Sequence, residues 1–287
     1  MTKTVLVTGA SAGIGKATAI YLAQNGYNVY GAARRTEKMQ DLKNHGIKPI
    51  SLDVTKEESM VACVEQIFQE AGSIDILVNN AGFGSSGAIE DVSMEDARYQ
   101  LEVNVFGAMR LTQLVLPKMR ENKFGKVVNI SSIGGKIAFP MAGWYHASKF
   151  AMEALSDSLR LEVKSFGIDV IVIEPGGIKS EWADVANNTL KRTSVNSVYK
   201  NLAQSLEKLN ANDNFPEPIV IAKLIKRKPK INIVAITPEQ SAQTLVNALR
   251  SGVKSYVKKD CDSQEIIEKY YSLLMSEADR GAILLGV

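Results

Sequence analysis

The sequence contains few of the residues that build disulfide frameworks and metal sites. Among its 287 residues are only two cysteines, Cys63 and Cys261, and only two histidines, His45 and His146. The cysteines lie too far apart in the sequence to suggest a disulfide framework or a metal-binding pair. A zinc site built from cysteine and histidine is therefore not expected.

Long apolar runs and a strong charge imbalance are also missing. No apolar run reaches the roughly 18 residues of a membrane-spanning helix, and the first residues lack the apolar core of a secretory signal. The formal net charge of +3 gives no argument for nucleic acid as a partner. With 45% apolar and 23% charged residues, the composition is that of a globular protein. We therefore expect a cytoplasmic protein without a metal site, a membrane span or a nucleic-acid partner.

Strand-like apolar runs alternate with helical patterns over most of the chain. The runs fall at 4–8, 28–33, 48–52, 75–78, 126–131 and 168–173. This alternation is typical of βαβ units that build a parallel sheet. It predicts an α/β fold in which residues 1–287 form a single domain, a doubly wound parallel sheet of the Rossmann type with helices on both faces. Ligands of such folds bind at the carboxyl ends of the strands. The residues expected there are Gly9, Asp53, Asn79, Ser132 and Pro175.

A glycine-rich turn follows the first apolar run. It contains Gly9, Gly13 and Gly15, and a helical pattern begins directly after it. Glycines permit a tight turn and a close approach of the backbone, and the unpaired N–H groups at a helix start favour a pyrophosphate. The spacing differs from Gly-x-Gly-x-x-Gly, because three residues separate the first two glycines and one separates the last two. By itself the turn is compatible with nucleotide binding or with a tight strand-to-helix connection.

Tyr145 is the only tyrosine with a lysine, Lys149, four residues later. On a helix this spacing puts both side chains on one face. An ammonium about 4 Å from a phenol favours the phenolate by roughly 4 kcal/mol at an effective dielectric constant near 20. We therefore expect the pKa of Tyr145 to fall from about 10 by up to about 3 units, into the range of a general acid or base. Alone, the spacing is explained equally by an ordinary surface pair.

Several motifs in order resemble the short-chain dehydrogenase/reductase family, in its large core subgroup. They are Thr8-Gly9-x-x-x-Gly13-Ile14-Gly15, Leu52-Asp53-Val54, Asn79-Asn80-Ala81-Gly82, Asn104, Ser132, Tyr145-x-x-x-Lys149 and Pro175-Gly176. The resemblance covers about residues 1–182 and fades beyond them. The run Ser132-Ile133-Gly134-Gly135 is similar to the hydroxysteroid and retinol dehydrogenase type.

The resemblance implies four catalytic residues. Ser132 would orient a substrate carbonyl or hydroxyl by hydrogen bonding, and Tyr145 would give or take the proton. Lys149 would lower the pKa of the tyrosine and bind the nicotinamide ribose. Asn104 would hold a water that completes a proton path. Ser132 is preferred to its neighbour Ser131 because it lies thirteen residues before Tyr145, the usual distance in the family.

The resemblance also implies a nicotinamide dinucleotide as cofactor. The expected binding residues are Gly9, Ser11, Gly13, Ile14, Gly15, Arg34, Asp53, Val54, Asn80, Ala81, Gly82, Tyr145, Lys149, Pro175, Gly176 and Ile178. Ala33 stands where NAD-binding relatives carry an acidic residue, and Arg34 offers a guanidinium for the 2′-phosphate of NADP(H). NADP(H) is therefore the expected cofactor. Arg35 either assists Arg34 or is a solvated neighbour. Asp53 is expected at the adenine ring, and the start of a helix would explain it as well.

Substrate class and the last third of the chain leave alternatives open. Apolar side chains expected near the catalytic residues are Phe83, Ile137, Phe139, Met141, Trp144 and Trp182. They favour a mainly apolar ketone or secondary alcohol, although ordinary packing explains them too. A helix and strand within 237–257 is the preferred end of the sheet, which makes 177–236 a substrate-covering insertion. A second helix-then-strand pattern at 216–234 is the alternative.

The sequence thus predicts an NADP(H)-dependent oxidoreductase that transfers a hydride between the nicotinamide and such a substrate. A homodimer or homotetramer through the helices of Asn104 and Tyr145 is implied by the resemblance. Two other functions stay open: an NADP-sensing regulatory protein without turnover, and a reductase of carrier-linked 3-oxoacyl groups. For the second, the basic cluster at 223–230 would contact the phosphate of the carrier, and a solvated surface is its simpler explanation.

Overall fold

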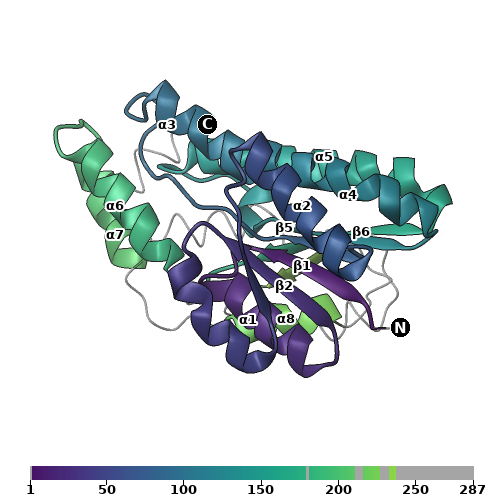
Figure 1. The fold of residues 1–287 in the computed structure, drawn as a ribbon. Coiled ribbons are helices and arrows are strands. Elements are labelled where there is room, and N and C mark those ends of the chain that lie inside the picture. Colours follow the sequence, from purple (N-terminus) through teal and green to yellow (C-terminus); the bar gives the residue numbers. More distant parts are fainter. Residues whose placement is uncertain (1, 179–180, 211–215, 227–232, 237–287) are drawn as a thin grey trace.

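One parallel sheet of seven strands lies at the centre of the part that the computed structural model describes, residues 2–178, 181–210, 216–226 and 233–236. The strands are β1 (Thr4–Thr8), β2 (Asn28–Ala33), β3 (Lys48–Ser51), β4 (Ile76–Asn79), β5 (Gly125–Ile130), β6 (Ile168–Pro175) and β7 (Ile233–Ile236). Their order is β3-β2-β1-β4-β5-β6-β7, and all neighbours are parallel (Figure 1). The predicted doubly wound α/β fold is confirmed, and the six predicted strands lie close to the observed bounds.

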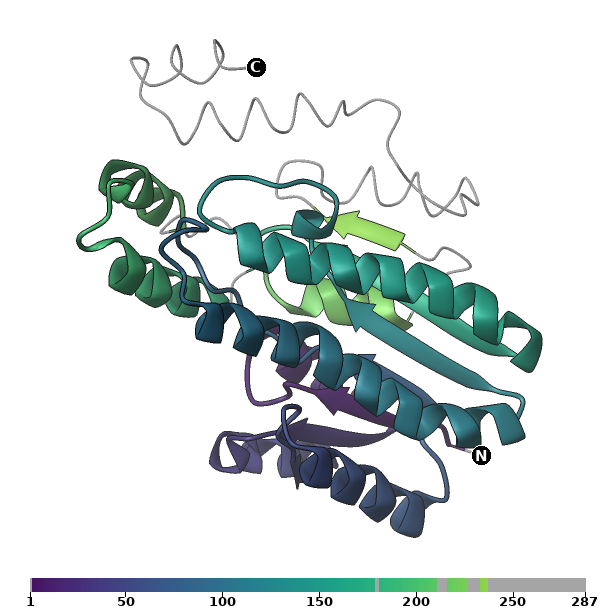
Figure 2. The ribbon, with the colours of Figure 1, turned by 90° about the horizontal axis from the view of Figure 1, so that it is seen from above.

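Helices cover both faces of this sheet (Figures 1 and 2). The α-helices are α1 (Gly13–Gln24), α2 (Glu57–Ala71), α3 (Met94–Leu101), α4 (Gly107–Glu121), α5 (Gly143–Val163), α6 (Trp182–Ser194), α7 (Lys200–Asn210) and α8 (Ile219–Lys226). The shorter elements are the 3₁₀ helices η1 (Thr36–His45), η3 (Ile133–Gly135) and η4 (Lys164–Phe166) and the π-helical turn η2 (Glu102–Phe106). In the described part, no helix combines the length and hydrophobicity that a membrane crossing requires.

Two apolar cores explain why these segments fold as they do. Every residue of β1 is buried, as expected for a parallel strand with helices on both faces. Val5 and Val7 face one core together with Leu22 of α1 and Ile221 of α8. Leu6 faces the other core, where helices α2 and α4 contribute side chains. The period of two along the strand thus decides which helix each residue contacts.

The strand order reverses between β1 and β4, which places the ligand-binding end of the sheet. β1 pairs with β2 on one side and with β4 on the other. Connections leave these strands toward opposite faces, so the carboxyl ends of β1 and β4 border a crevice. The glycine turn follows β1 at this point, and Asn80 follows β4. Ser93 caps α3 by accepting a hydrogen bond from the Asp96 N–H at 3.1 Å.

The end of the sheet differs from the preferred prediction. Strand β7 pairs with β6 in the register Val172↔Ile233, and α8 packs against α1. The prediction that 177–236 forms only a substrate-covering insertion is therefore wrong in its last part, and the alternative at 216–234 is the one observed. Helix α8 has only eight residues, of which Ile221, Ala222 and Ile225 are buried, so it gives a shorter pattern in the sequence than the segment at 237–257. That segment lies outside the described residues.

Candidate active site

The turn between β1 and α1 accepts only glycine at two positions. Gly9 has φ +68°, and a Cβ there would lie 2.7 Å from Asn80 Nδ2. A Cβ on Gly15 would lie 2.4 Å from the Gly9 carbonyl oxygen and 2.5 Å from Asn80 Nδ2. The N-cap residue of α1, Ala12, provides no side-chain acceptor for the first N–H groups of the helix. The turn therefore has the bare backbone and the open helix start that a pyrophosphate requires, and a dinucleotide fits it.

Thr8 and Asn80 hold this turn against the end of β4. Thr8 Oγ1 accepts hydrogen bonds from the N–H groups of Asn80 at 3.0 Å and Ala81 at 2.9 Å. Asn80 Nδ2 donates to the Thr8 carbonyl oxygen at 2.9 Å. Thr8 was not among the predicted site residues, although it begins the glycine motif. Its hydroxyl ties together the two strands that border the crevice.

Asp53 lies at the carboxyl end of β3, as predicted for a residue at an adenine pocket. Its Oδ1 accepts hydrogen bonds from Thr55 N at 3.0 Å and Thr55 Oγ1 at 2.8 Å. Partial burial opposes ionisation of Asp53, but these bonds and the charge of Arg34 outweigh it and lower the pKa. The adjacent Val54 is buried in the core on that face. Arg34 Nη1 donates to the Tyr99 hydroxyl at 2.8 Å.

Arg35 rather than Arg34 reaches the glycine turn. Its Nη2 donates to Ser11 Oγ at 3.1 Å. The two neighbouring guanidinium groups thus point to different sides, Arg34 to Tyr99 and Arg35 to Ser11. A cavity of about 720 Å³ opens beside Ser11 and Gly13. Its other lining residues are Ala12, Lys16, Ala17, Ile20, Lys38, Glu181, Asp184, Glu217 and Pro218.

Ser132 and Tyr145 meet at the carboxyl end of β5. The Ser132 side chain is hydrogen-bonded to Tyr145, and Ser132 Oγ also accepts from Gly134 N at 3.0 Å. The Pro175 carbonyl oxygen, at the end of β6, lies 3.4 Å from Ser132 Oγ. Ser131 Oγ is buried and has no hydrogen-bond partner among the described residues. Of the two serines, Ser132 is the one in contact with the tyrosine.

Lys149 lies beside Tyr145 on α5 but is directed to the backbone. Its Nζ donates to the Ile130 carbonyl oxygen at 2.8 Å and lies 5.8 Å from the centroid of the Tyr145 ring. Burial raises the pKa of Tyr145 to about 12, and the hydrogen bond with Ser132 offsets only part of this. Burial also lowers the pKa of Lys149 to about 8. The prediction of a lowered tyrosine pKa is therefore wrong for the chain alone, because desolvation outweighs the hydrogen bond with Ser132 and the Lys149 ammonium is directed to a backbone carbonyl.

Asn104 lies in the π-helical turn η2, where its side chain is fully hydrogen-bonded. Asn104 Nδ2 donates to the Phe83 carbonyl oxygen at 2.9 Å and to Ser148 Oγ at 3.0 Å. Asn104 Oδ1 accepts from Phe83 N at 3.0 Å. Ser148 Oγ in turn donates to the Tyr145 carbonyl oxygen at 2.7 Å. The amide thus ties the segment after β4 to the helix of Tyr145 and Lys149. The water-binding role implied by the resemblance stays a prediction.

His146 is a positioning residue that the sequence reasoning missed. Its Nδ1 lies 2.9 Å from the Gly134 carbonyl oxygen, and its Nε2 accepts from Phe139 N at 3.2 Å. Burial lowers the pKa of His146, so the ring stays neutral and can donate on one side while accepting on the other. The imidazole closes the loop that carries Ser132. In the sequence, the position of His146 next to Tyr145 was the available signal for this role, and a role as metal ligand was the only one considered.

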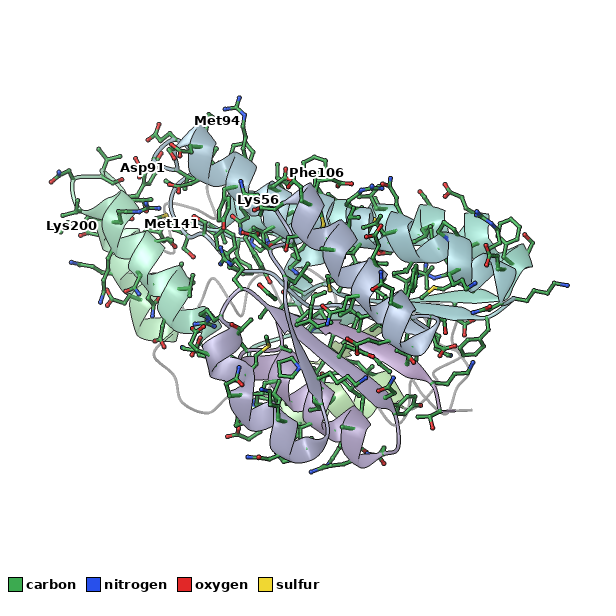
Figure 3. All side chains as sticks on the ribbon, viewed as in Figure 1. Lys56, Asp91, Met94, Phe106, Met141 and Lys200 are labelled. Atoms are coloured by element: carbon green, nitrogen blue, oxygen red, sulfur yellow. The ribbon has the colours of Figure 1, made fainter. Side chains whose placement is uncertain are left out.

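Some of the apolar residues predicted for a substrate pocket are buried in the core, and others contact aromatic rings. Met141 is buried against Leu190, Ala203 and Leu206 of the α6–α7 pair and has φ +65°, which is uncommon for a residue other than glycine (Figure 3). The predicted residues Phe83 and Phe139 contact the Tyr99 and His146 rings, Ile137 is buried, and Trp144 is half-buried. The Trp182 side chain lies outside the described residues.

The predicted cofactor residues after β6 lie beside the same end of the sheet. Pro175 ends β6 and is buried, and Gly176 follows it half-buried. Ile178 packs against the core beneath α1. The structure thus brings the glycine turn, Asp53, the Ser132–Tyr145–Lys149 group and Pro175 to one end of the sheet, as the sequence predicts.

A buried carboxylate pair lies one helical turn beyond Lys149. Lys136 Nζ lies 2.9 Å from Glu153 Oε2 and 3.5 Å from Glu174 Oε1, and both glutamates are almost fully buried. Burial and the charge of Glu153 raise the pKa of Glu174 from its ordinary 4.5 to about 8. The folded chain therefore binds one more proton than the unfolded chain between these pH values, and the free energy of unfolding falls as the pH rises through them.

We predict that Glu174→Gln removes this pH dependence. The variant is expected to be more stable than the wild type by roughly 1–3 kcal/mol at pH 8 and equally stable below pH 4.5. Urea unfolding at several pH values measures the difference. Glu58→Gln, at an exposed position on α2, is the control and should show no such trend. A difference for Glu174→Gln that stays constant with pH would contradict the prediction.

The chain is similar to a family of dehydrogenases and to proteins named as reductases. The family model described as "short chain dehydrogenase" matches residues 3–191. A 3-ketodihydrosphingosine reductase of Bacteroides thetaiotaomicron is 38% identical over 231 residues, 78% of this chain and 84% of the relative. An NADPH-dependent 3-dehydrocapnine reductase of Ornithobacterium rhinotracheale is 35% identical over 245 residues, 80% and 86% of the two chains. The crystal structure of a short-chain dehydrogenase from Streptomyces avermitilis has a TM-score of 0.69 at 32% identity and covers 88% of this chain and 94% of its own.

Proposed function

Because the chain belongs to the short-chain dehydrogenase/reductase family of oxidoreductases, we propose that it is an NADP(H)-dependent carbonyl reductase or alcohol dehydrogenase with Tyr145 as general acid/base. The observation that carries this proposal is the hydrogen-bonded pair of Ser132 and Tyr145 beside Lys149. This group lies at the same end of the sheet as the glycine turn.

Three catalytic residues and two positioning residues have separate roles in the proposed reaction. Ser132 and Tyr145 donate hydrogen bonds to the carbonyl oxygen of the substrate, which polarises its carbon. Tyr145 then gives its proton to this oxygen as the alkoxide forms, and Lys149 stabilises the resulting phenolate through its charge. Asn104 and His146 hold the segments of Lys149 and Ser132 in place. The bound nicotinamide supplies or accepts the hydride.

The raised pKa of Tyr145 fits the start of a carbonyl reduction, in which the tyrosine must carry its proton. With its pKa raised to about 12 by burial, Tyr145 is protonated at neutral pH and starts as a proton donor. Lys149, with its pKa lowered to about 8 by burial, still carries a proton near pH 7 in most molecules. A nearby phenolate would stabilise this ammonium further. The ion pair between the Lys149 ammonium and the Tyr145 phenolate therefore forms only when Tyr145 gives up its proton.

Four residues near the turn support NADP(H) over NAD(H). Ala33 leaves no carboxylate at the end of β2 to repel a phosphate, and Arg34 and Arg35 follow it. Ser11 and Arg35 are hydrogen-bonded at 3.1 Å, so that a hydroxyl and a guanidinium lie together beside the turn. The relative from Ornithobacterium is named for NADPH dependence. We therefore propose that Arg35 binds the 2′-phosphate beside the turn and that Arg34 exchanges its contact with Tyr99 for the same phosphate.

Arg34→Ala and Arg35→Ala are each expected to weaken NADPH binding about 10- to 100-fold, because a charged hydrogen bond contributes about 1.5–3 kcal/mol. NADH binding should change less than about threefold, since NADH lacks the 2′-phosphate. Fluorescence titrations of both dinucleotides measure the two losses. Lys43→Ala removes an exposed cation on η1 and should leave the binding of both dinucleotides unchanged. Equal losses of NADPH and NADH, or tighter NADH binding by the wild type, would refute the assignment.

For the substrate we propose a mainly apolar ketone or the corresponding secondary alcohol. Two similar proteins are named as reductases of a 3-keto and a 3-dehydro compound, which agrees with carbonyl reduction. NADPH oxidation with a panel of ketones that includes 3-ketodihydrosphingosine tests the proposal. Absence of turnover with the whole panel, despite tight NADPH binding, would favour the regulatory alternative.

The carrier-linked 3-oxoacyl reductase is retained as a second candidate. Of its basic cluster, Lys223 is exposed on α8, and 227–230 lie outside the described residues. A cytoplasmic homodimer or homotetramer also remains a proposal. Phe106 of η2 and Phe150, Leu155 and Leu161 of α5 are exposed, which agrees with an interface there.

A further inference from the structure

Glu181, directly before α6, contacts the basic residues that follow β2. Its Oε2 accepts a hydrogen bond from Arg35 Nη2 at 2.9 Å, and its Oε1 accepts from Lys38 Nζ at 3.1 Å. The same Arg35 nitrogen donates to Ser11 Oγ at 3.1 Å. These contacts join positions 146 and 143 residues apart in the sequence. One carboxylate is thus held by two cations beside a hydroxyl of the glycine turn.

This donor set is also the one that a phosphate monoester would require. Phosphates bind to arginine, lysine and hydroxyl donors, and arginine offers two parallel N–H groups. Hydrogen bonds from Lys38 and Arg35 lower the pKa of Glu181, so the carboxylate is ionised at neutral pH. Glu181 therefore presents a negative charge to Arg35, which is proposed above to bind the cofactor phosphate, and to the neighbouring Lys38.

Glu181 lies between its donors Arg35 and Lys38 and the helices α6 and α7. Figures 1 and 2 show α6 and α7 side by side at the carboxyl end of the sheet. From α6, Leu190 packs with Met141 in a small apolar core that also includes Ala203 and Leu206 of α7. A change in the partners of Glu181 therefore acts at the start of an element that contacts the loop before Tyr145.

We propose that Glu181 is a specificity-determining residue, which occupies the 2′-phosphate site of NADP(H) in the free protein and is displaced when that phosphate binds. The inference rests on the proposed function, because it requires NADP(H) as the cofactor. NADPH must break the two ion pairs of Glu181, whereas NADH brings no phosphate to this place. Glu181 thus reduces the preference for NADPH below the value that Arg35 and Lys38 alone would give.

The test compares Glu181→Gln with wild type in titrations of NADPH and NADH without substrate. Exposed ion pairs are weak, so we expect about three- to tenfold tighter NADPH binding and a change in NADH binding within about twofold. Asp184→Asn is the matched control. Asp184 lines the same cavity, is exposed and has no ion pair within the described part of the chain, so its removal should leave the ratio of the two dissociation constants unchanged.

The outcomes separate the inference from the function on which it rests. If the wild type prefers NADPH but Glu181→Gln leaves the ratio unchanged, or weakens NADPH, then only the role of Glu181 is wrong. If Asp184→Asn tightens NADPH equally, general charge and not displacement explains the effect. If the wild type does not prefer NADPH, the proposed cofactor and the inference fail together. Thermal unfolding of both variants should match wild type, since the Glu181 and Asp184 side chains are exposed.

Discussion

Tyr145→Phe is expected to reduce turnover by at least about 10³-fold while leaving NADPH binding within about twofold. The substitution removes only the hydroxyl oxygen, which is the proposed proton donor and the partner of Ser132. The ring itself remains to fill the same buried volume, so the fold should be retained. Steady-state rates with a reducible ketone, together with NADPH titrations, measure the two effects separately.

The control for this experiment is a tyrosine away from the site. Tyr199 lies before α7 with 37% of its surface exposed, and Tyr199→Phe should keep the wild-type turnover. Ser132→Ala should lower turnover by less than Tyr145→Phe, because the serine orients the substrate and gives no proton. Turnover by Tyr145→Phe near the wild-type rate would exclude this residue as the acid, and a parallel loss of NADPH binding would instead indicate a disturbed cofactor site.

Gly15→Ala is expected to have the second large effect, a loss of NADPH affinity of at least about tenfold with a destabilisation of about 1–3 kcal/mol. The added Cβ would lie 2.4 Å from the Gly9 carbonyl oxygen, so backbone must move. Asn80 Nδ2, 2.5 Å from the added Cβ, belongs to a side chain, but the contact with the Gly9 backbone cannot be relieved by a side-chain movement. The turn then loses the shape that admits a pyrophosphate. NADPH titration and urea unfolding measure the two losses.

A stability-matched control distinguishes the shape of the turn from general destabilisation. Ala23→Gly lies on the same helix α1, at a partly buried position away from the turn. Glycine inside a helix costs about 1 kcal/mol relative to alanine. The control should therefore lose comparable stability and keep its NADPH affinity. Equal affinity losses in both variants would show that the turn geometry is not what limits binding.

The fold could be predicted from sequence because its signals are local. Buried parallel strands require continuous apolar runs, and the six predicted runs coincide with β1 to β6. The last strand was placed correctly only by the alternative prediction. A four-residue strand after an eight-residue helix gives a weak pattern, and only pairing with β6 shows that this segment completes the described sheet.

The place of the predicted site residues in the fold could be inferred from the sequence better than their electrostatic state. The motifs around Gly9, Ser132 and Tyr145 are short runs, so their spacing can be read directly from a single sequence. Their meeting at one end of the sheet follows from the parallel order of the strands. Thr8 and His146 were missed because their roles consist of hydrogen bonds to backbone groups, and a backbone partner leaves no signature in the sequence.

By itself the sequence determined the α/β class, the glycine turn and the pairing of Tyr145 with Lys149 on one helix, since each depends on residues within a few positions of one another. Only the tertiary structure decided that burial raises the pKa of Tyr145 to about 12, and that Glu181 meets Arg35 across 146 positions. Desolvation depends on everything packed around a group, and a long-range ion pair depends on where two distant segments are brought together. Neither quantity is contained in a local pattern of residues.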